Sequence, residues 1–301
     1  MALRDNAARK LANTTKSPPQ LPAITPRWLV SLLQWLPVEG GVYRVNRAKG
    51  DDPVEVACGA RDERELPSTC VDYEEAPREY NLSVLSTVLD VHTRVSDLYN
   101  QPFDQIREQL RLTIESVKER QESELINNQD YGLMSNAAPS QRISTREGPP
   151  TPDDLDELIA RVWKEPAFFL AHPRAIAAFG RECTRRGVPP PTVNLFGSPF
   201  VTWRGLPLVP SDKLFIEGEG AGGKTSILLL RVGEKKQGIV GLFQPGLPGE
   251  QTPGLSVRFM GINQKGIGQY LISLYCSLAV LVPDALGILE NVEVGSYHDY
   301  R

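Results

Sequence analysis

The stretch "QPFDQIREQLRLTIESVKERQESELINNQDYG", residues 101–132, contains the longest regular pattern in the chain. Pro102 suits a first helical turn, and Gly132 lies just beyond the end of the pattern. The polar positions mix Arg, Lys and Glu, as expected of a helix surface that faces water. The pattern predicts a helix of about seven turns, which is long for a globular domain. Its apolar stripe, with spacings of three and four residues, comprises Phe103, Ile106, Leu110, Ile114, Val117 and Leu125.

The chain composition is that of a globular protein and excludes several classes. There are 301 residues, of which 41% are hydrophobic and 23% charged, enough for a core without disulfides or metals. A net charge of −4 disfavours a general nucleic-acid binder. Four scattered cysteines and three histidines disfavour a structural zinc site and suit reduced thiols. The charged N-terminus and the short apolar run at 271–283 predict neither a secretory signal nor a membrane span, so we expect a cytoplasmic protein.

The segments before the long helix predict an arm and a projecting loop. Residues 1 to about 26 include the proline-rich "TTKSPPQLPAITPRW", which favours extended backbone. Apolar residues at helical spacing from Trp28 to Leu36 predict a short helix ended by Pro37. "GGVYRVNR" is a predicted strand. Residues 40 to about 80 carry many charges and few large apolar residues, so we expect a two-stranded loop that something else stabilises.

Further elements follow on both sides of the long helix. The alternation in "NLSVLSTVLDVHTRVSDLYN" favours a strand, although a helix stays possible. Residues 135–152 are a predicted linker, and Thr151 with Asp154 predicts a capping box at the start of the next helix. The acidic residues of that first turn complement the helix dipole better than they suggest a metal site. "AFFLA" is a predicted strand, "PRAIAAFGRECTRRG" a helix and "VPPPTVN" a stiff loop.

Residues 217–230, "EGEGAGGKTSILLL", match a phosphate-binding loop. Such a loop needs a buried strand before it and a helix starting at its Lys-Thr pair. Here a continuous apolar, β-branched run follows Thr225 and stops at Gly233, which predicts a strand instead. We therefore interpret the match as a glycine-rich turn between two antiparallel strands and expect no nucleotide binding. The motif positions are Gly218, Gly223, Lys224 and Thr225.

The sequence shows no constellation typical of catalysis. It lacks a nucleophile elbow, a metalloprotease motif, a dinucleotide-binding motif followed by a helix, and any Cys/His pairing. We therefore expect no catalytic residues, no cofactor and no metal, and an enzyme is disfavoured. This absence favours a structural or assembly role.

Several long segments resemble the family 2A encapsulin shell proteins, which have the Hong Kong 97 phage-capsid fold. They are "LANTTKSPPQLPAITPRWL" (11–29), residues 71–127, "AFGRECTRRGVPPPTV" (178–193), "GLFQPGLPGEQTPGLSVRFMGIN" (241–263) and "YLISLYCSLAVL" (270–281). The order of predicted elements is similar too. The resemblance implies an α+β fold with an N-terminal arm, an extended loop, a peripheral domain with a long spine helix, and an axial domain.

The resemblance implies particular domain boundaries. Residues 1–37 would form the arm and first helix, 38–82 the extended loop, and 83–150 the peripheral domain with its spine helix. Residues 151–260 would be mainly axial domain, and 261–301 would return to the peripheral domain and end in a C-terminal tail.

The resemblance also implies a function. The chain would assemble with itself into an icosahedral shell, most simply of sixty copies, forming a cytoplasmic nanocompartment. The implied cargo is a cysteine desulfurase with a disordered N-terminal targeting segment, in a sulfur-handling compartment. Neither nucleic acid nor a membrane is an expected partner. A phage or prophage major capsid protein is the alternative with the same fold, and an enzyme using the phosphate-loop match is a third.

Two sets of residues are candidate sites in such a shell. The loop from Arg181 to Asn194 follows a helix of the implied axial domain, which suggests a place near a five-fold pore where cations would favour anions. A helix C-terminus decorated with Arg is an equally good interpretation. The pore-loop candidates are Arg181, Arg185, Arg186, Pro189 and Asn194. Trp28 and Trp35 are predicted anchors of the arm or of an interface between copies. Cargo identity, pore selectivity and shell size stay open.

Overall fold

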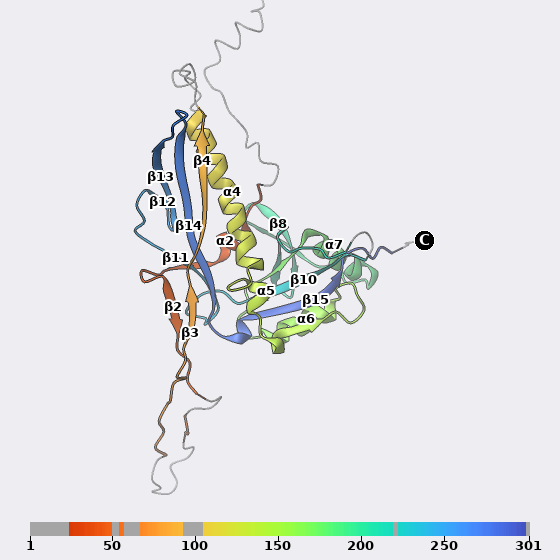
Figure 1. The fold of residues 1–301 in the computed structure, drawn as a ribbon. Helices are drawn as coiled ribbons and strands as arrows, with labels where there is room; N and C mark the ends of the chain where they lie inside the picture. Colours follow the sequence, from red (N-terminus) through yellow and green to blue (C-terminus); the bar gives the residue numbers. More distant parts are fainter. Residues whose placement is uncertain (1–23, 50–53, 57–66, 93–104, 219–221, 299–301) are drawn as a thin grey trace, which may run out of the picture.

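The computed structural model describes residues 24–49, 54–56, 67–92, 105–218 and 222–298, and Figure 1 shows its elements. The helices are α2 (Trp28–Leu32), α4 (Gln105–Asn127), α5 (Leu133–Asn136), α6 (Pro152–Arg161) and α7 (Pro173–Arg185), with 3₁₀ turns η1 (Pro139–Gln141) and η3 (Pro283–Ala285). The strands are β1 (Gln34–Pro37), β2 (Val42–Val45), β3 (Arg78–Asn81), β4 (Ser83–Val91), β5 (Arg142–Ser144), β6 (Phe168–Ala171), β7 (Thr192–Leu195), β8 (Ser198–Trp203), β9 (Leu206–Pro210), β10 (Lys224–Leu230), β11 (Ile239–Phe243), β12 (Glu250–Thr252), β13 (Leu255–Ile262), β14 (Gly268–Val280) and β15 (Leu286–Glu293).

A six-stranded sheet packs against the long helix α4 (Figure 1). Five of its strands follow the order β1-β11-β14-β13-β12, and the sixth, β4, also pairs with β14. Ile114 and Val117 of α4 pack against Ile272 and Leu274 of β14. The predicted long helix is therefore confirmed over residues 105–127, and Phe103 of its stripe lies outside the described residues.

The strand prediction for the segment before α4, residues 81–100, is confirmed over residues 83–91, and residues 93–100 lie outside the described residues. β4 runs antiparallel to β14 over nine residues, with Leu89 opposite Tyr270. Leu85 and Leu89 join the core beneath α4, whereas Val84 and Val88 are exposed. This alternation is what one buried sheet face requires.

A seven-stranded sheet carries the second half of the fold, in the order β5-β15-β10-β6-β9-β8-β7. Helices α6 and α7 cover one of its faces, where Leu155, Phe169 and Phe179 are completely buried. Its other face shares a core with α2, the end of α4 and the ends of β11 and β14. Helix α6 begins with the predicted capping box, in which Thr151 and Asp154 exchange both hydrogen bonds.

Three sequence expectations need correction. The helix predicted from Trp28 to Leu36 ends at Leu32, and Gln34–Pro37 is strand β1, paired in parallel with β11. The ring of Trp35 lies so close over Gly241 that a Cβ there would be 2.6 Å from it, so tertiary packing overrides the helical spacing. The predicted linker 135–152 contains β5, and the predicted stiff loop contributes β7.

The predicted projecting loop is present as far as it is described. β2 and β3 form an antiparallel pair that points away from both sheets (Figure 1). A further bridge joins Ala48 to Tyr73. Towards the tip, Val54, Val56 and Tyr73 are exposed apolar side chains. None of these three described side chains is buried in a core, in keeping with the low apolar content of the loop.

Sheet membership does not follow the predicted domain boundaries. Strands β11 to β13, which fall within or reach just past residues 151–260, lie in the six-stranded sheet with β4. Strand β15, which falls within 261–301, lies in the seven-stranded sheet beside β10. The division into arm, loop, peripheral domain and axial domain stays a prediction.

Candidate functional site

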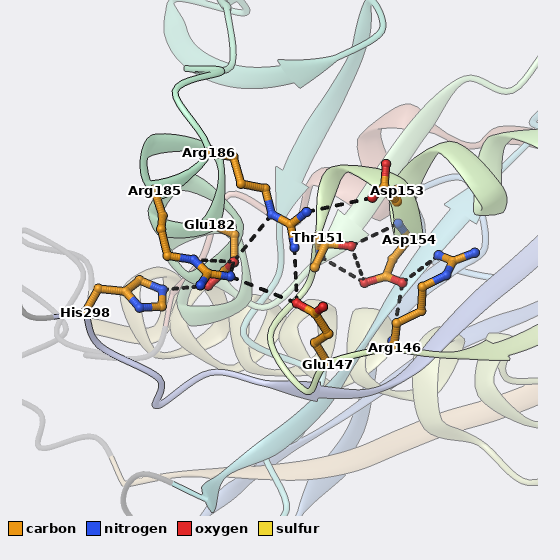
Figure 2. Close-up of polar contacts among 9 residues, drawn as sticks. All are labelled: Arg146, Glu147, Thr151, Asp153, Asp154, Glu182, Arg185, Arg186 and His298. Atoms are coloured by element: carbon orange, nitrogen blue, oxygen red, sulfur yellow. Dashed lines mark hydrogen bonds and ion pairs between the residues drawn. The ribbon is translucent and has the colours of Figure 1, made fainter.

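Two of the predicted pore candidates, Arg185 and Arg186, lie against a buried carboxylate, Glu182, in the last turn of α7 (Figure 2). Only 1% of its side chain is exposed. Arg185 Nη2 donates to Glu182 Oε2 at 2.8 Å, and His298 Nε2 lies 2.6 Å from Glu182 Oε1. Burial alone would raise the pKa of Glu182, but the hydrogen bonds from His298 and Arg185 outweigh it and lower that pKa. The carboxylate is therefore held in its charged form.

Helix α7 also holds the C-terminal segment, residues 294–298, in place. The guanidinium of Arg181 donates to the carbonyl oxygens of Ser296, at 3.0 Å, and Val294, at 2.8 Å. Its carbon lies 4.3 Å from the ring centroid of Tyr297, in a cation–π contact. Together with His298 on Glu182, these contacts fix residues 294–298 along α7.

A second polar group continues the network toward the start of α6 (Figure 2). Arg186 Nη2 lies 3.2 Å from Glu147 Oε2, and Arg186 Nη1 lies 3.8 Å from Asp153 Oδ2. The buried Asp154 accepts a hydrogen bond from Arg146 at 2.9 Å besides serving in the capping box. The network thus joins the ends of α6 and α7 through side chains from three separate segments.

These contacts weaken the electrostatic effect that Arg181, Arg185 and Arg186 can have on an anion nearby. Arg185 and Arg186 face carboxylates of their own chain, and Arg181 is held by carbonyl oxygens and an aromatic ring. Their charge is therefore largely compensated locally, which weakens the field that they offer to a passing anion. Pro189 and Asn194 lie beyond them in a mostly exposed stretch, residues 187–194. The pore assignment stays a prediction.

The two predicted anchors pack within their own chain. The ring of Trp28 lies 5.3 Å from that of Phe200, edge to face, and 5.7 Å from that of Phe196. Trp35 donates its indole N–H to the carbonyl oxygen of Val30 at 2.9 Å. Both side chains therefore anchor α2 and β1 to the rest of the subunit, and a contact of either one with another copy stays a prediction.

The phosphate-loop match lies in a setting unlike that of a nucleotide site. Lys224 begins strand β10, so the strand prediction is confirmed and the helix that such a loop needs is not formed there. Glu217 and Lys224 exchange backbone hydrogen bonds of 2.7 and 2.8 Å across the turn, and Gly218 has φ +87°. The adjacent cavity of about 320 Å³ is lined by Glu217 and Glu290 as well as Lys224, and the carboxylates would repel phosphates.

The sequence analysis did not identify a group of polar contacts that joins residues 25–27, at the end of the predicted arm, to α4. Glu119 accepts hydrogen bonds from the backbone N–H and the hydroxyl of Thr25, at 2.8 and 2.9 Å. Arg27 lies 2.6 Å from Glu115 and 3.1 Å from Glu119, and Lys213 lies 2.9 Å from Glu119. The sequence shows Glu115 and Glu119 four residues apart on α4. Their partners are about ninety residues away in sequence, so no local pattern connects them.

Within the part of the chain that is described, no group of three or more His, Cys, Asp or Glu side chains is arranged to hold a metal ion. No described helix is long and apolar enough to cross a membrane. Cys70, Cys183 and Cys276 are free thiols, and the latter two are buried.

The chain is similar to known shell proteins over its whole length. A family model described as "Type 2A encapsulin shell protein SrpI-like" matches residues 42–296. The type 2A encapsulin shell protein SrpI of Synechococcus elongatus is 69% identical over 301 residues, which cover 100% of this chain and 97% of that protein. The solved holo-SrpI encapsulin complex from the same organism gives a TM-score of 0.87 at 66% identity, with 100% of each chain covered.

Capsid structures share the fold at much lower identity. The capsid of a native GTA particle gives a TM-score of 0.61 at 14% identity, covering 97% of this chain and 100% of that chain. A likeness at this identity speaks for the fold alone. It confirms the predicted α+β capsid fold of the Hong Kong 97 type.

Proposed function

Because the chain belongs to the SrpI-like family of type 2A encapsulin shell proteins, we propose that its copies close into a shell around a cargo enzyme, a cysteine desulfurase. The relatives are named as shell proteins, which are structural components and not enzymes, and this agrees with the expectation of a non-enzyme. The chain is accordingly an encapsulin shell protein. Cargo, copy number and compartment belong to the proposal.

The observation that best supports closure is the projecting β2–β3 hairpin. Among the described residues of its outer part, Val54, Val56 and Tyr73 expose apolar side chains, and none of the three is buried in a core. The body of the subunit exposes complementary apolar side chains, Phe259, Met260 and Ile262, on the β13 end of the six-stranded sheet. Two different apolar surfaces on one chain suit a head-to-tail contact, and head-to-tail contacts that close generate rings.

We propose the simplest icosahedral shell, of sixty copies, in the cytoplasm. The buried free thiols Cys183 and Cys276 suit a reducing compartment. The proposed cargo is the desulfurase with a disordered targeting segment, in a compartment that handles sulfur. Residues 181–194 are the proposed pore loop, and because carboxylates of the same chain face Arg185 and Arg186, we expect these arginines to select anions only weakly.

Electron microscopy of the protein expressed alone tests self-assembly. Uniform closed particles are the expected result, and single subunits or small oligomers at the same concentration would overturn the proposal. Co-expression with a cysteine desulfurase then tests the cargo. The full-length desulfurase should co-purify with the particles, whereas a desulfurase without its N-terminal segment should not. Equal recovery of both forms would contradict the proposed targeting.

A further inference from the structure

Arg27, the residue immediately before α2, has an unusual backbone conformation. Its φ of 49° and ψ of 53° place it in the left-handed region. The clash of a Cβ with the following carbonyl oxygen disfavours this region by about tenfold. A residue at this position ordinarily has extended backbone and caps the helix with a short polar side chain, and Arg27 does neither. Contacts elsewhere must therefore hold it left-handed.

The side chain of Arg27 supplies such contacts, because it reaches α4 beside α2 (Figure 1). Its Nη1 lies 2.6 Å from Glu115 Oε2 and 3.1 Å from Glu119 Oε1. All three side chains are at most 20% exposed, so solvent screens these ion pairs only partly. Glu119 also accepts two hydrogen bonds from Thr25. These contacts fasten residues 25–27 to α4 and oppose the backbone strain.

The way in which the chain is anchored changes at Arg27. After it, Leu29 is completely buried, and Trp28 packs against the same core. Before it, none of residues 24–26 has a buried side chain. The core therefore holds α2, whereas residues 24–26 are held mainly by their polar contacts with α4.

Loose packing beside this segment leaves room for a second position. A cavity of about 580 Å³ is lined by Pro26 and Arg27 together with Lys118 and Gln121 of α4. A close-packed interior would resist a rotation of the backbone, and a cavity of this size does not. Rotation about φ of Arg27 turns the residues before it relative to α2, so a change at this one residue moves the segment.

We propose that Arg27 is a strained hinge: its ion pairs with α4 hold residues 24–26 against that helix, and loss of these pairs releases the segment. On release, Arg27 returns to the extended backbone that is usual before a helix. The segment before α2 thereby has a bound and a released position, while α2 stays in the core. The hinge acts within one subunit and does not depend on the proposed shell.

The test compares alanine with glycine at this position in the full-length protein. Arg27→Ala and Arg27→Gly both remove the ion pairs, but only glycine adopts left-handed backbone without strain. The readout is hydrogen exchange, measured by mass spectrometry, in peptides that contain Thr25, whose amide is bonded to Glu119 in the bound position. Pro26 separates Thr25 from the substituted residue, so the intrinsic exchange rate of that amide does not change.

We expect exchange at Thr25 to be slowest in the parent, faster in Arg27→Gly and fastest in Arg27→Ala. The relief of strain is partly offset by the greater freedom of glycine, which leaves a difference of about fivefold between the two variants. Glycine ordinarily loosens a backbone more than alanine does, so this order identifies left-handed strain. Exchange in Arg27→Gly that equals or exceeds that in Arg27→Ala would overturn the inference, as would parental exchange in Arg27→Ala.

A matched pair of variants at Ser31, within α2, is the control. Ser31→Gly should open α2 more than Ser31→Ala does, which is the reverse order. The amide of Leu33, bonded to the carbonyl oxygen of Leu29, reports this opening. Faster exchange in the alanine variant at both positions would show that the effect does not come from the backbone of Arg27, and would overturn the inference.

The amide of Leu29, which is bonded to Glu122, reports whether each variant is folded. It should stay protected in every variant, because the core holds α2. If it is unprotected in Arg27→Ala, Arg27→Gln takes the place of that variant, since glutamine also lacks the charge and keeps the Cβ. The same order of exchange against Arg27→Gly is then expected, and the same reversal would overturn the inference.

Discussion

The side-chain carboxylate of Glu122 accepts a hydrogen bond at 3.0 Å from the backbone N–H of Leu29, and both residues are almost completely buried. This bond joins the C-terminal part of α4 to α2, the helix that follows the arm. The Glu122 carboxylate is thus held in an apolar setting, because Leu29 belongs to the core shared by the two sheets. Glu122 is thus a point where the attachment of the arm depends on pH.

We predict that Glu122→Gln stabilises the protein increasingly as pH rises from 4.5 to 7. Burial raises the pKa of Glu122 from 4.5 to about 7, although the Leu29 N–H and Lys213 oppose the rise. The folded chain therefore binds the proton more tightly than the unfolded chain, and this contribution, present below pH 4.5, is lost by about pH 7. The loss amounts to at most about 3 kcal/mol.

Unfolding temperatures of the variant and the parent, measured across this pH range, check the prediction. Glu108→Gln, at a partly exposed position near the start of the same helix, is the control and should show no such growing difference. A constant difference between Glu122→Gln and the parent at all pH values would contradict the raised pKa.

Replacing Glu119 should release the root of the arm. Glu119→Ala removes the acceptor of two Thr25 hydrogen bonds and a partner of both Arg27 and Lys213. We expect a loss of about 2 kcal/mol in unfolding free energy and faster amide hydrogen exchange at residues 24–28. Glu115→Ala removes only the Arg27 and Lys118 contacts and should have a smaller effect. Equal exchange in both variants would show that Glu119 is not the main attachment.

Helix α4 and the capping box of α6 could be predicted because their signals are local. The apolar spacing of Ile114 and Val117 specifies a face, and Thr151 needs Asp154 only three residues away. Strand β1 could not be predicted in this way. Trp35 and Leu36 carry helical spacing, and their extended backbone is decided by parallel pairing with β11, about two hundred residues later.

In the candidate site too, features with a local sequence signal could be predicted and contacts between distant segments could not. Arg181, Arg185 and Arg186 could be identified from their position after a helix. The carbonyl oxygens that hold Arg181 are more than a hundred residues away, and Glu147, which faces Arg186, is 39 residues away, so the sequence did not show that these charges are compensated. The sequence around His298 suggests no partner for its side chain, yet the fold places it beside Glu182. The positions of the three arginines could therefore be predicted from the sequence, but the electrostatic field around them could not.

The C-terminal segment should detach when Glu182 loses its charge. Glu182→Gln weakens the contacts to His298 and Arg185, and we expect about 2 kcal/mol less stability together with faster amide exchange at residues 294–298. The lowered pKa of Glu182 means that its contribution is present above the unfolded pKa and is lost as pH falls through the folded one. Acid below pH 4.5, through the lowered folded pKa, should therefore mimic the substitution in the parent. Asp153→Asn, at an exposed position of the same network, should leave this exchange unchanged.

Two glycine substitutions should have opposite effects on stability. A Cβ at Gly241 would lie 2.6 Å from the Trp35 ring, so Gly241→Ala must displace that ring and should cost about 1–3 kcal/mol. A Cβ at Gly180, within α7, meets nothing within 4 Å. Gly180→Ala should therefore stabilise the protein by about 0.5–1 kcal/mol. Unfolding temperatures that fall for both variants would contradict this view of α7.

The glycine-rich turn should be dispensable for assembly. Lys224 and Thr225 begin strand β10, and the neighbouring Glu217 and Glu290 make the adjacent cavity unfavourable for phosphates. We expect no binding of ATP or GTP, with Mg²⁺ present, in calorimetric titration of the parent particles. Lys224→Ala should form particles of the same diameter in the same yield. Nucleotide binding that is present in the parent and abolished in this variant would show that the sequence match marks a real phosphate site despite its strand.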